Sequence, residues 1–414
     1  MSNLYGCIGE RLKHSFSKEI HNALADYDYR IIEVEREELG KFAEAKEFAA
    51  INVTIPYKEM IMPYLFEIDE HARSIGAVNT VVNRGGRLYG YNTDFYGMSA
   101  LLAHAGVSVK GKKVLILGTG GTSKTAYAVA AAEGAKEIVR VSRTGREDAV
   151  TYEAAYERHA DAEVIVNTTP MGMYPDIFGR AVELDRFPSL SGVIDAVYNP
   201  LRTPMIIEAK KRGIKAEGGL YMLVAQAVRA SEIFIDVKYD AEECERAYRK
   251  IASDKENVVL IGMPASGKST VGKLLAARLG RRLIDTDELI KAKVGKDIPT
   301  IFSEDGEAVF REVECEVIKK CAKETGVIIA TGGGAVLRSE NVDALRENGR
   351  LYFIDRPLES LMPTTDRPLS STRDAIKKRY EERYGIYNAA ADVRIDADCY
   401  PNAVLNKIIE DFSK

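Results

Sequence analysis

Two glycine-rich loops have the residue types and spacing of phosphate-binding sites. The first, Gly118-Thr-Gly120-Gly121, follows the apolar run KVLIL and precedes an alanine-rich stretch. The second, GMPASGKST at 262–270, follows NVVLI and precedes VGKLLAARL. A loop between a strand and a helix presents backbone N–H groups and a helix N-terminus to an anion. The first loop is typical of a dinucleotide site and the second of a nucleoside triphosphate site, so we expect two different phosphate-bearing ligands.

The residues at the end of the strand expected after the first loop indicate which dinucleotide would bind. The strand ends in SRTGR at 142–146, with no Asp or Glu. An acidic residue there would bond the ribose 2′-OH of NAD, whereas arginines suit the 2′-phosphate of NADP. A helix-capping turn followed by two solvated arginines is the alternative without a ligand. The candidate cofactor contacts are Gly118, Gly120, Gly121, Ser142, Arg143, Thr144 and Arg146.

The second loop matches the pattern GxxxxGKS. In such a loop the backbone amides hold phosphates, the lysine reaches the β and γ oxygens, and the serine coordinates Mg²⁺. These roles fall to Lys268 and Ser269. A glycine-rich turn with an exposed lysine is the alternative. The candidate ATP contacts are Gly262, Ala265, Ser266, Gly267, Lys268, Ser269 and Thr270.

Short apolar runs alternate with helix-length amphipathic stretches along nearly the whole chain. This alternation predicts an α/β fold with largely parallel sheets. A helical stretch is expected over 219–252, and the charged segment 253–257 is expected to be a short linker. Strands are predicted at 4–9, 29–35, 49–55, 113–117, 137–142, 163–167, 192–196, 258–262, 283–285, 327–330, 350–354 and 393–395.

The overall composition excludes several classes of partner. The 414 residues are 46% hydrophobic and 29% charged with a formal net charge of −4, so no basic surplus attracts nucleic acid or anionic membranes. Five cysteines form no CxxC pair, which is typical of reduced thiols in the cytosol. The N-terminus has no secretory signal pattern, and the apolar run 126–132 is too short to span a bilayer. We therefore expect a cytoplasmic protein.

Over residues 3–250 the chain resembles shikimate dehydrogenases. The resemblance implies a substrate-binding domain at 1–104 and a Rossmann-like NADP domain at 105–252, whose last helices pack back on the first domain. The active site is then expected in the cleft between them. The matching stretches are HSFSKEIHN (14–22), NVTIPYK (52–58), GAVNTV (76–81), YNTDFYG (91–97), NTTPMGM (167–173), DAVYNPLRTP (195–204) and GGLYMLVAQA (218–227).

The resemblance implies that Lys58 and Asp94 are the catalytic pair. When hydride reaches a carbonyl carbon, the oxygen needs a proton, which a lysine ammonium can supply while a carboxylate keeps it charged. Without the flanking motifs, a surface ion pair would be the preferred explanation of the two residues. The substrate contacts implied are Ser15, Ser17, Asn52, Thr54, Asn79, Tyr198 and Gln226, and Gly219 is implied beside the cofactor.

Over residues 257–414 the chain resembles shikimate kinases, which implies a P-loop domain at 258–414. Asp287 would bond the substrate hydroxyls and accept a proton, Asp285 would hold Mg²⁺ through water, and Arg367 would close with a lid. One of the two aspartates could instead cap the helix expected over 288–294. The matching stretches are LIDTDELI (283–290), GEAVFREVE (306–314), TGGGAVL (331–337), DRPL (366–369) and RYGIYNAAADVRID (383–396). The substrate contacts implied are Arg311, Arg383, Gly332, Gly333 and Gly334.

Together the resemblances imply two consecutive reactions of one small substrate. NADPH would reduce 3-dehydroshikimate to shikimate, and ATP with Mg²⁺ would phosphorylate the new hydroxyl. One alternative is a quinate or shikimate oxidoreductase that uses NAD and carries a small-molecule kinase domain; for the second half alone, another P-loop kinase is the alternative. A ligand-sensing regulator that lost catalysis is a third possibility, although Lys58, Asp94, Lys268 and Asp287 are all present.

Overall fold

The computed structural model describes residues 4–10, 12, 16–145, 148–362 and 372–413, and its chain divides into two compact units. Unit 1 takes in the chain up to Met173, then Gly179–Asn199 and Glu208–Ile251. Unit 2 takes in Tyr174–Phe178, Pro200–Ile207 and the chain from Ala252 onward. In the part of the chain described, no helix is long and apolar enough to cross a membrane.

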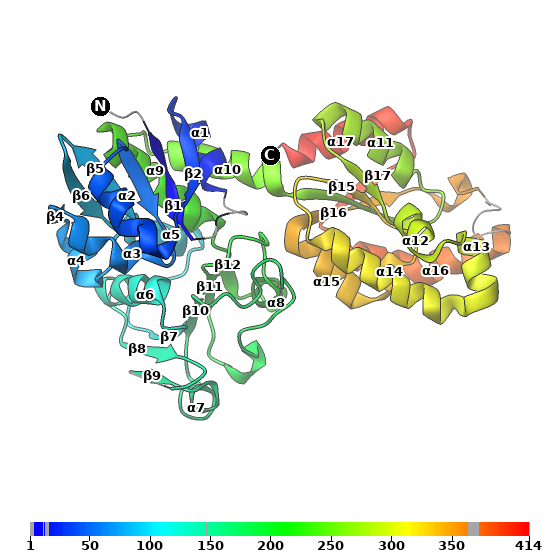
Figure 1. Ribbon diagram of the computed structural model, residues 1–414. Helices are drawn as coiled ribbons and strands as arrows, with labels where there is room; N and C mark the ends of the chain where they lie inside the picture. The colour runs from blue at the N-terminus through cyan, green and yellow to red at the C-terminus, as the bar shows by residue number, and fades with distance from the viewer. Residues whose placement is uncertain (1–3, 11, 13–15, 146–147, 363–371, 414) are drawn as a thin grey trace. The chain divides into compact units, whose positions relative to one another are not determined.

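The first sheet of unit 1 has the strand order β2-β1-β3-β5-β6-β4 (Figure 1). β1 lies parallel to β2 and β3, and β5 lies antiparallel to β3 and β6. Its strands are β1 Tyr5–Gly9, β2 Tyr29–Glu33, β3 Ala50–Val53, β4 Glu67–Ile68, β5 Thr80–Arg84 and β6 Arg87–Tyr91. The helices are α1 Ser17–Leu24, α2 Leu39–Ala45, α3 Tyr57–Met60, α4 Glu70–Ile75 and α5 Thr93–His104.

The second sheet of unit 1 is parallel throughout, in the order β12-β11-β10-β7-β8-β9. Two βαβ halves that diverge from a central strand give this order, and ligands bind at the carboxyl ends of such strands. The strands are β7 Lys113–Leu117, β8 Glu137–Val141, β9 Ala149–Val150, β10 Val164–Asn167, β11 Gly192–Asp195 and β12 Lys215–Glu217. The helices are α6 Gly121–Ala132, α7 Tyr152–Arg158, α8 Pro204–Lys211, α9 Leu220–Ile235 and α10 Glu243–Lys255, of which α8 begins and α10 ends in unit 2.

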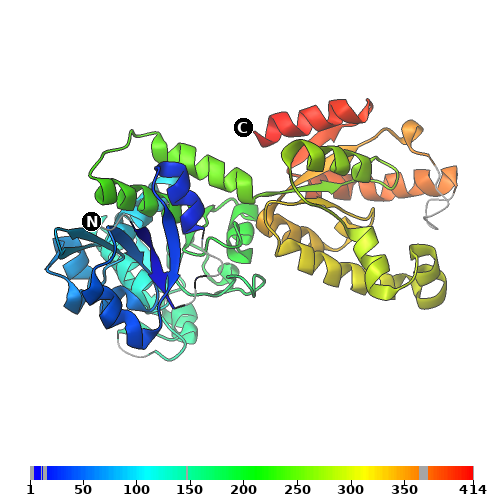
Figure 2. The same cartoon turned by 45° about the horizontal axis from the view of Figure 1, so that its top comes forward.

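Unit 2 is built on a parallel sheet with the order β14-β15-β13-β16-β17. In Figures 1 and 2, α11 and α17 cover one face, and α14, α15 and α16 lie on the other. Its strands are β13 Asn257–Ile261, β14 Leu283–Asp285, β15 Ile328–Ala330, β16 Gly349–Asp355 and β17 Val393–Asp396. The helices are α11 Lys268–Leu279, α12 Thr286–Val294, α13 Ile298–Thr300, α14 Gly306–Ala322, α15 Ser339–Asn348, α16 Arg373–Ala390 and α17 Pro401–Phe412.

Alternation along β13 explains why this sheet needs helices on both faces. Val258 and Leu260 pack into the core beside α11 and α17, whereas Val259 and Ile261 pack into the core beside α14 and α15. Successive side chains of a strand point to opposite faces of the sheet, so a strand in which every residue is apolar must be covered by helices on both faces. Single-turn helices complete the fold: η1 Arg36–Glu38, η2 Met62–Tyr64, η3 Leu184–Arg186, η4 Ile301–Asp305, η5 Ala335–Leu337 and η6 Leu358–Ser360.

Several elements differ from the sequence prediction. The β5–β6 hairpin, β4, β9 and β12 were not predicted; the hairpin turns at Gly85-Gly86, whose φ angles of 60° and 82° glycine adopts without strain. The helix predicted over 219–252 is broken, because Asp236 takes the left-handed conformation and ends α9. The predicted linker 253–257 holds the end of α10 and the start of β13, with Glu256 between them.

Candidate active sites

The centre of the first site is an ion pair between Lys58 and Asp94. Lys58 lies in α3 and Asp94 in the first turn of α5, and Nζ donates to Oδ2 at 2.5 Å. Their side chains are only 16% and 11% exposed. The carbonyl of Lys58 also accepts the amide of Val78 at 2.8 Å, which fixes the backbone behind the ammonium. The arrangement holds one lysine ammonium oriented by its carboxylate.

A buried polar network fixes three of the predicted substrate contacts. Asn52, at the end of β3, accepts the Tyr29 hydroxyl at 2.6 Å. Asn79 Oδ1 accepts the amide of Thr93 at 2.7 Å, and Asn79 Nδ2 donates to Thr93 Oγ1 at 3.1 Å. Thr93 Oγ1 in turn donates to Gln226 Oε1 of α9 at 3.2 Å. Buried polar side chains held in this way keep fixed orientations for a ligand.

The remaining predicted substrate contacts come from loops and helix ends. Ser17 is buried at the start of α1, and Thr54 follows β3, where its amide donates to the carbonyl of Ile8 at 3.0 Å. The ring of Tyr198, in the loop after β11, lies 5.3 Å from that of Phe16. Ser15 lies outside the described residues.

His21 lies near this site without being able to serve as an acid at neutral pH. Burial lowers its pKa to about 3, so the imidazole is neutral. Its Nδ1 shares a hydrogen bond with the Tyr27 hydroxyl at 2.6 Å, and its ring stacks on that of Tyr29 at 4.0 Å. His21 therefore supports the ring that fixes Asn52.

The glycine loop after β7 meets the same region of unit 1. Gly118 has φ of 106°, and a Cβ there would lie 2.9 Å from Thr168 Oγ1, so glycine is required. Gly120 caps α6, and the Ser123 hydroxyl donates to the Gly118 carbonyl at 2.7 Å. A Cβ on Gly121 would lie 4.0 Å from the Lys58 side chain. The loop thus brings a phosphate-binding helix N-terminus beside the ion pair.

The other predicted cofactor contacts are placed around the sheet. Arg143 is exposed after β8, followed by Thr144, and Ser142 Oγ accepts the amide of Gly145 at 3.0 Å. A side chain on Gly219 would collide with the carbonyl of Ala196. Arg146 lies outside the described residues. The turn after β8 with its exposed cation fits a 2′-phosphate.

The second site begins with the loop after β13. Gly262, Ala265 and Gly267 have positive φ angles of 147°, 64° and 96°. Lys268 is 4% exposed, and its Nζ donates to the carbonyls of Gly262 at 2.8 Å and Met263 at 2.9 Å. The loop, with Ser266 inside it and Thr270 in α11, fits a bound triphosphate.

The two aspartates after β14 have separate structural positions. Asp285 caps α12, accepting the amide of Asp287 at 3.0 Å, and its other oxygen accepts Ser269 Oγ at 2.7 Å. Ser269 and Asp285 are thus adjacent, as an Mg²⁺ site requires. Among the described residues no cluster of three or more His, Cys, Asp or Glu could hold a metal alone. A hydroxyl, one carboxylate and substrate phosphates fit Mg²⁺, which retains several of its waters.

The TGGGAVL segment packs against both predicted arginines. Arg383 Nη1 donates to the Gly333 carbonyl at 3.1 Å, and the Tyr387 hydroxyl donates to the same oxygen. A Cβ on Gly334 would lie well under 3.0 Å from the Arg311 guanidinium, and one on Gly332 would meet Asp287. The three glycines therefore allow the backbone to lie directly beside these groups. Arg367 lies outside the described residues.

Glu314 is a site residue that the sequence analysis missed. It is buried and accepts Arg311 Nη1 at 2.6 Å, while Glu307 accepts Nη2 at 3.0 Å. Burial raises the pKa of Glu314, and nearby Asp287 adds to the rise. Burial lowers the pKa of Arg311, but its two glutamates outweigh burial and the net shift is upward. The signal was present as R-x-x-E in FREVE, since residues three apart share a helix face. Tyr29 and Thr93, which bond Asn52 and Asn79, were also missed, as was Thr286, whose Oγ1 accepts the amide of Gly332 at 3.0 Å.

Comparison with known proteins agrees with this geometry. Residues 7–81 match the family model of the shikimate dehydrogenase substrate binding domain. The shikimate dehydrogenase (NADP(+)) of Clostridium beijerinckii is 37% identical over 261 residues, covering 59% of this chain and 96% of the relative. The chain belongs to the shikimate dehydrogenase family. Residues 264–413 match the shikimate kinase family model, so the dehydrogenase half is fused to a kinase domain.

Solved structures support the fold of the dehydrogenase half. Shikimate dehydrogenase 1 of Peptoclostridium difficile is 35% identical, with a TM-score of 0.57, covering 61% of this chain and 98% of that one. The shikimate dehydrogenase of Thermus thermophilus, solved with NADP(H) and shikimate, is 30% identical with a TM-score of 0.54, covering 60% and 99%. The α/β architecture expected for this half is therefore confirmed.

Proposed function

We propose that the chain catalyses two consecutive steps. The dehydrogenase half reduces 3-dehydroshikimate to shikimate with NADPH, and the kinase domain phosphorylates shikimate to shikimate 3-phosphate with ATP and Mg²⁺. The observation that carries the proposal is the Lys58–Asp94 pair at 2.5 Å beside Gly121, in a chain that also holds a complete P-loop. Family membership of both halves supports it.

In the first step the residues of unit 1 orient the ketone and supply a proton. Bound NADPH supplies the hydride. Lys58 Nζ donates a proton to the carbonyl oxygen as charge develops there, and Asp94 keeps the ammonium oriented. Asn52, Asn79 and Gln226, fixed by their network, would read the ring hydroxyls. Hydride and proton together convert the ketone to an alcohol.

In the second step the kinase domain holds the new hydroxyl beside the P-loop. Bound ATP supplies the phosphoryl group, with Mg²⁺ on its phosphates. Asp287 orients the substrate hydroxyl and accepts its proton, while Arg311 and Arg383 bind the ring carboxylate. Lys268 and the loop amides neutralise the phosphate charge. Two arginines beside the TGGGAVL segment favour an anionic substrate over other acceptors of P-loop kinases.

One reaction tube tests both steps. Purified protein receives 3-dehydroshikimate, NADPH, ATP and Mg²⁺, and mass spectrometry follows the products. Shikimate 3-phosphate is expected, while accumulation of shikimate would refute the kinase step. Lys58→Ala is expected to abolish reduction and spare phosphorylation of supplied shikimate, and Lys268→Ala to do the reverse. Lys41→Ala and Lys273→Ala, at exposed positions of α2 and α11, are the matched controls.

The same protein distinguishes the rival functions. A quinate or shikimate oxidoreductase that uses NAD would oxidise quinate with NAD⁺ faster than it oxidises shikimate with NADP⁺. A ligand-sensing regulator would bind shikimate in calorimetry without turnover in either assay. Since NADPH and ATP are metabolites of the cell interior, the cytoplasm stays the proposed location.

A further inference from the structure

Two short segments of the dehydrogenase half belong structurally to unit 2. Tyr174–Phe178, the first inserted segment, and Pro200–Ile207, the second inserted segment, interrupt the stretches of unit 1. They follow the loops at the carboxyl ends of β10 and β11. In a sheet of this order, ligands bind at that edge. The chain therefore passes from two ligand-facing loops straight into the kinase unit.

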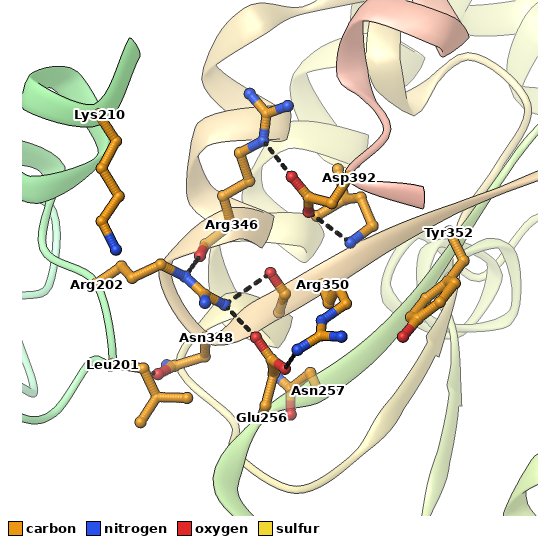
Figure 3. Close-up of polar contacts among 12 residues, drawn as sticks. Leu201, Arg202, Lys210, Glu256, Asn257, Arg346, Asn348, Arg350, Tyr352 and Asp392 are labelled. Atoms are coloured by element: carbon orange, nitrogen blue, oxygen red, sulfur yellow. Dashed lines mark hydrogen bonds and ion pairs between the residues drawn. The ribbon is translucent and has the colours of Figure 1, made fainter. Parts of the chain in front are cut away.

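Arg202 anchors the second inserted segment to the end of α15. Its guanidinium donates to the carbonyls of Arg346 at 2.9 Å and Gly349 at 3.0 Å, and to Glu256 Oε1 at 2.7 Å (Figure 3). Its amide donates to the carbonyl of Glu347 at 2.9 Å. The last carbonyls of a helix lack partners inside the helix and carry partial negative charge. Arg202 therefore caps a kinase helix from outside the kinase sequence.

Glu256 makes this anchor costly to break. Its side chain is 9% exposed and lies between Arg202, at 2.7 Å, and Arg350, at 3.1 Å (Figure 3). Removing one partner of a buried charge pair leaves part of the other charge uncompensated. Leu201 adds a neutral contact, because its amide donates to Asn348 Oδ1 at 2.9 Å.

The first inserted segment is held by the kinase core itself. Ile177 is fully buried in the core cluster that contains Val259 and Ile329. Lys323 Nζ donates to the Pro175 carbonyl at 2.7 Å and lies 5.8 Å from the ring centroid of Phe178. The first inserted segment is thus held by the burial of Ile177 in the core and by the contacts of Lys323 with Pro175 and Phe178.

The anchors lie only a few residues from predicted ligand contacts. Tyr198, which packs on Phe16, is separated from Leu201 by two residues, a span of at most about 10 Å. Its loop begins at Asp195, whose Oδ1 accepts the amide of Val197 at 3.0 Å. The other loop includes Thr168, which packs against Gly118 of the glycine loop.

We propose that Arg202 is a positioning residue for the dehydrogenase reaction. By fixing the second inserted segment in the kinase unit, it holds the loop that carries Tyr198 in its substrate-binding position, and Lys323 holds the loop after β10 in the same way. The kinase domain thereby serves as a scaffold for the dehydrogenase site as well as a catalyst. This inference rests on the proposed function.

The test is Arg202→Gln in the full chain, with shikimate oxidation by NADP⁺ and phosphorylation by ATP measured separately. KM for shikimate in the oxidation is expected to rise about fivefold while kcat and the kinase constants stay within about twofold. Arg180→Gln, which breaks an exposed pair with Glu208 inside unit 1, is the matched control and should change nothing. An unchanged KM in an Arg202→Gln protein with full kinase activity overturns the proposal.

If Arg202→Gln also loses kinase activity, a second variant tests the proposal. Lys323, directly after α14, is a half-buried donor to the first inserted segment that Lys323→Ala removes, and Lys320→Ala, exposed in the last turn of α14, is its control. KM for NADP⁺ is expected to rise by at least about threefold, with the kinase constants retained. Unchanged KM values in this variant overturn the proposal. Absence of shikimate oxidation in the unsubstituted protein would instead refute the proposed function.

Discussion

Glu347→Gln should stabilise the kinase unit by an amount that grows with pH. Glu347 lies in α15, is 2% exposed, and its Oε2 has no hydrogen-bond partner among the described residues. Burial raises the pKa of its carboxyl from 4.5 to about 9; Asp343 adds to the rise and Lys323 opposes it. At neutral pH the folded protein therefore holds this side chain as the neutral acid. Glutamine has the same shape and is neutral at every pH.

The magnitude follows from proton linkage. Between pH 4.5 and pH 9 the folded chain keeps a proton that the unfolded chain has released. The stability that Glu347 contributes is thus fully present below pH 4.5 and is lost as pH rises toward 9. Each pH unit in this window costs about 1.4 kcal/mol, so wild-type unit 2 should lose about 3 kcal/mol relative to Glu347→Gln between pH 6 and pH 8.

Urea unfolding at pH 6, 7 and 8 measures this difference. Because the chain has two units, the unfolding of unit 2 must be followed separately from that of unit 1. Pulse proteolysis does this when the surviving fragments are assigned by mass spectrometry. Glu381→Gln, at an exposed position of α16, is the matched control and should follow the wild-type pH profile. A stability difference between wild type and Glu347→Gln that does not change with pH would refute the assignment of a neutral buried acid.

Three further substitutions test the two sites by steady-state kinetics. Gly334→Ala places a Cβ against the Arg311 guanidinium. The KM for shikimate in the kinase reaction should therefore rise at least about tenfold, while the KM for ATP should stay the same. Equal changes in the two KM values would contradict a substrate role for Arg311. Tyr29→Phe releases Asn52, so KM for shikimate in the dehydrogenase reaction should rise about fivefold, and an unaltered KM would remove Asn52 from the substrate contacts. Arg143→Glu should lower the preference for NADPH over NADH at least about tenfold; a preserved preference would assign the 2′-phosphate to another group.

The local chemistry of both sites could be predicted from the sequence. A phosphate-binding loop needs a strand, glycines and a helix within about 20 residues, so GTGG and GMPASGKST could be predicted as phosphate-binding loops from their spacing and from their position between a strand and a helix. The cap at Asp285 is equally local, because an N-cap side chain bonds an amide two or three residues on. Apolar runs likewise predicted the central strands β7, β10, β13 and β16, which are buried on both faces.

Tertiary structure decided which distant residues meet. Lys58 and Asp94 lie 36 positions apart, and Thr93 and Gln226 lie 133 apart; no spacing rule predicts such contacts without the known family. The end of α9 at Asp236, a residue in the left-handed conformation, was also missed. The assignment of 174–178 and 200–207 to the kinase unit depends on a helix end and a hydrophobic core supplied by other parts of the chain. A sequence pattern reflects what a single helix, strand or loop requires. Packing brings together elements that lie far apart in the chain, and no local pattern predicts which of them will be in contact.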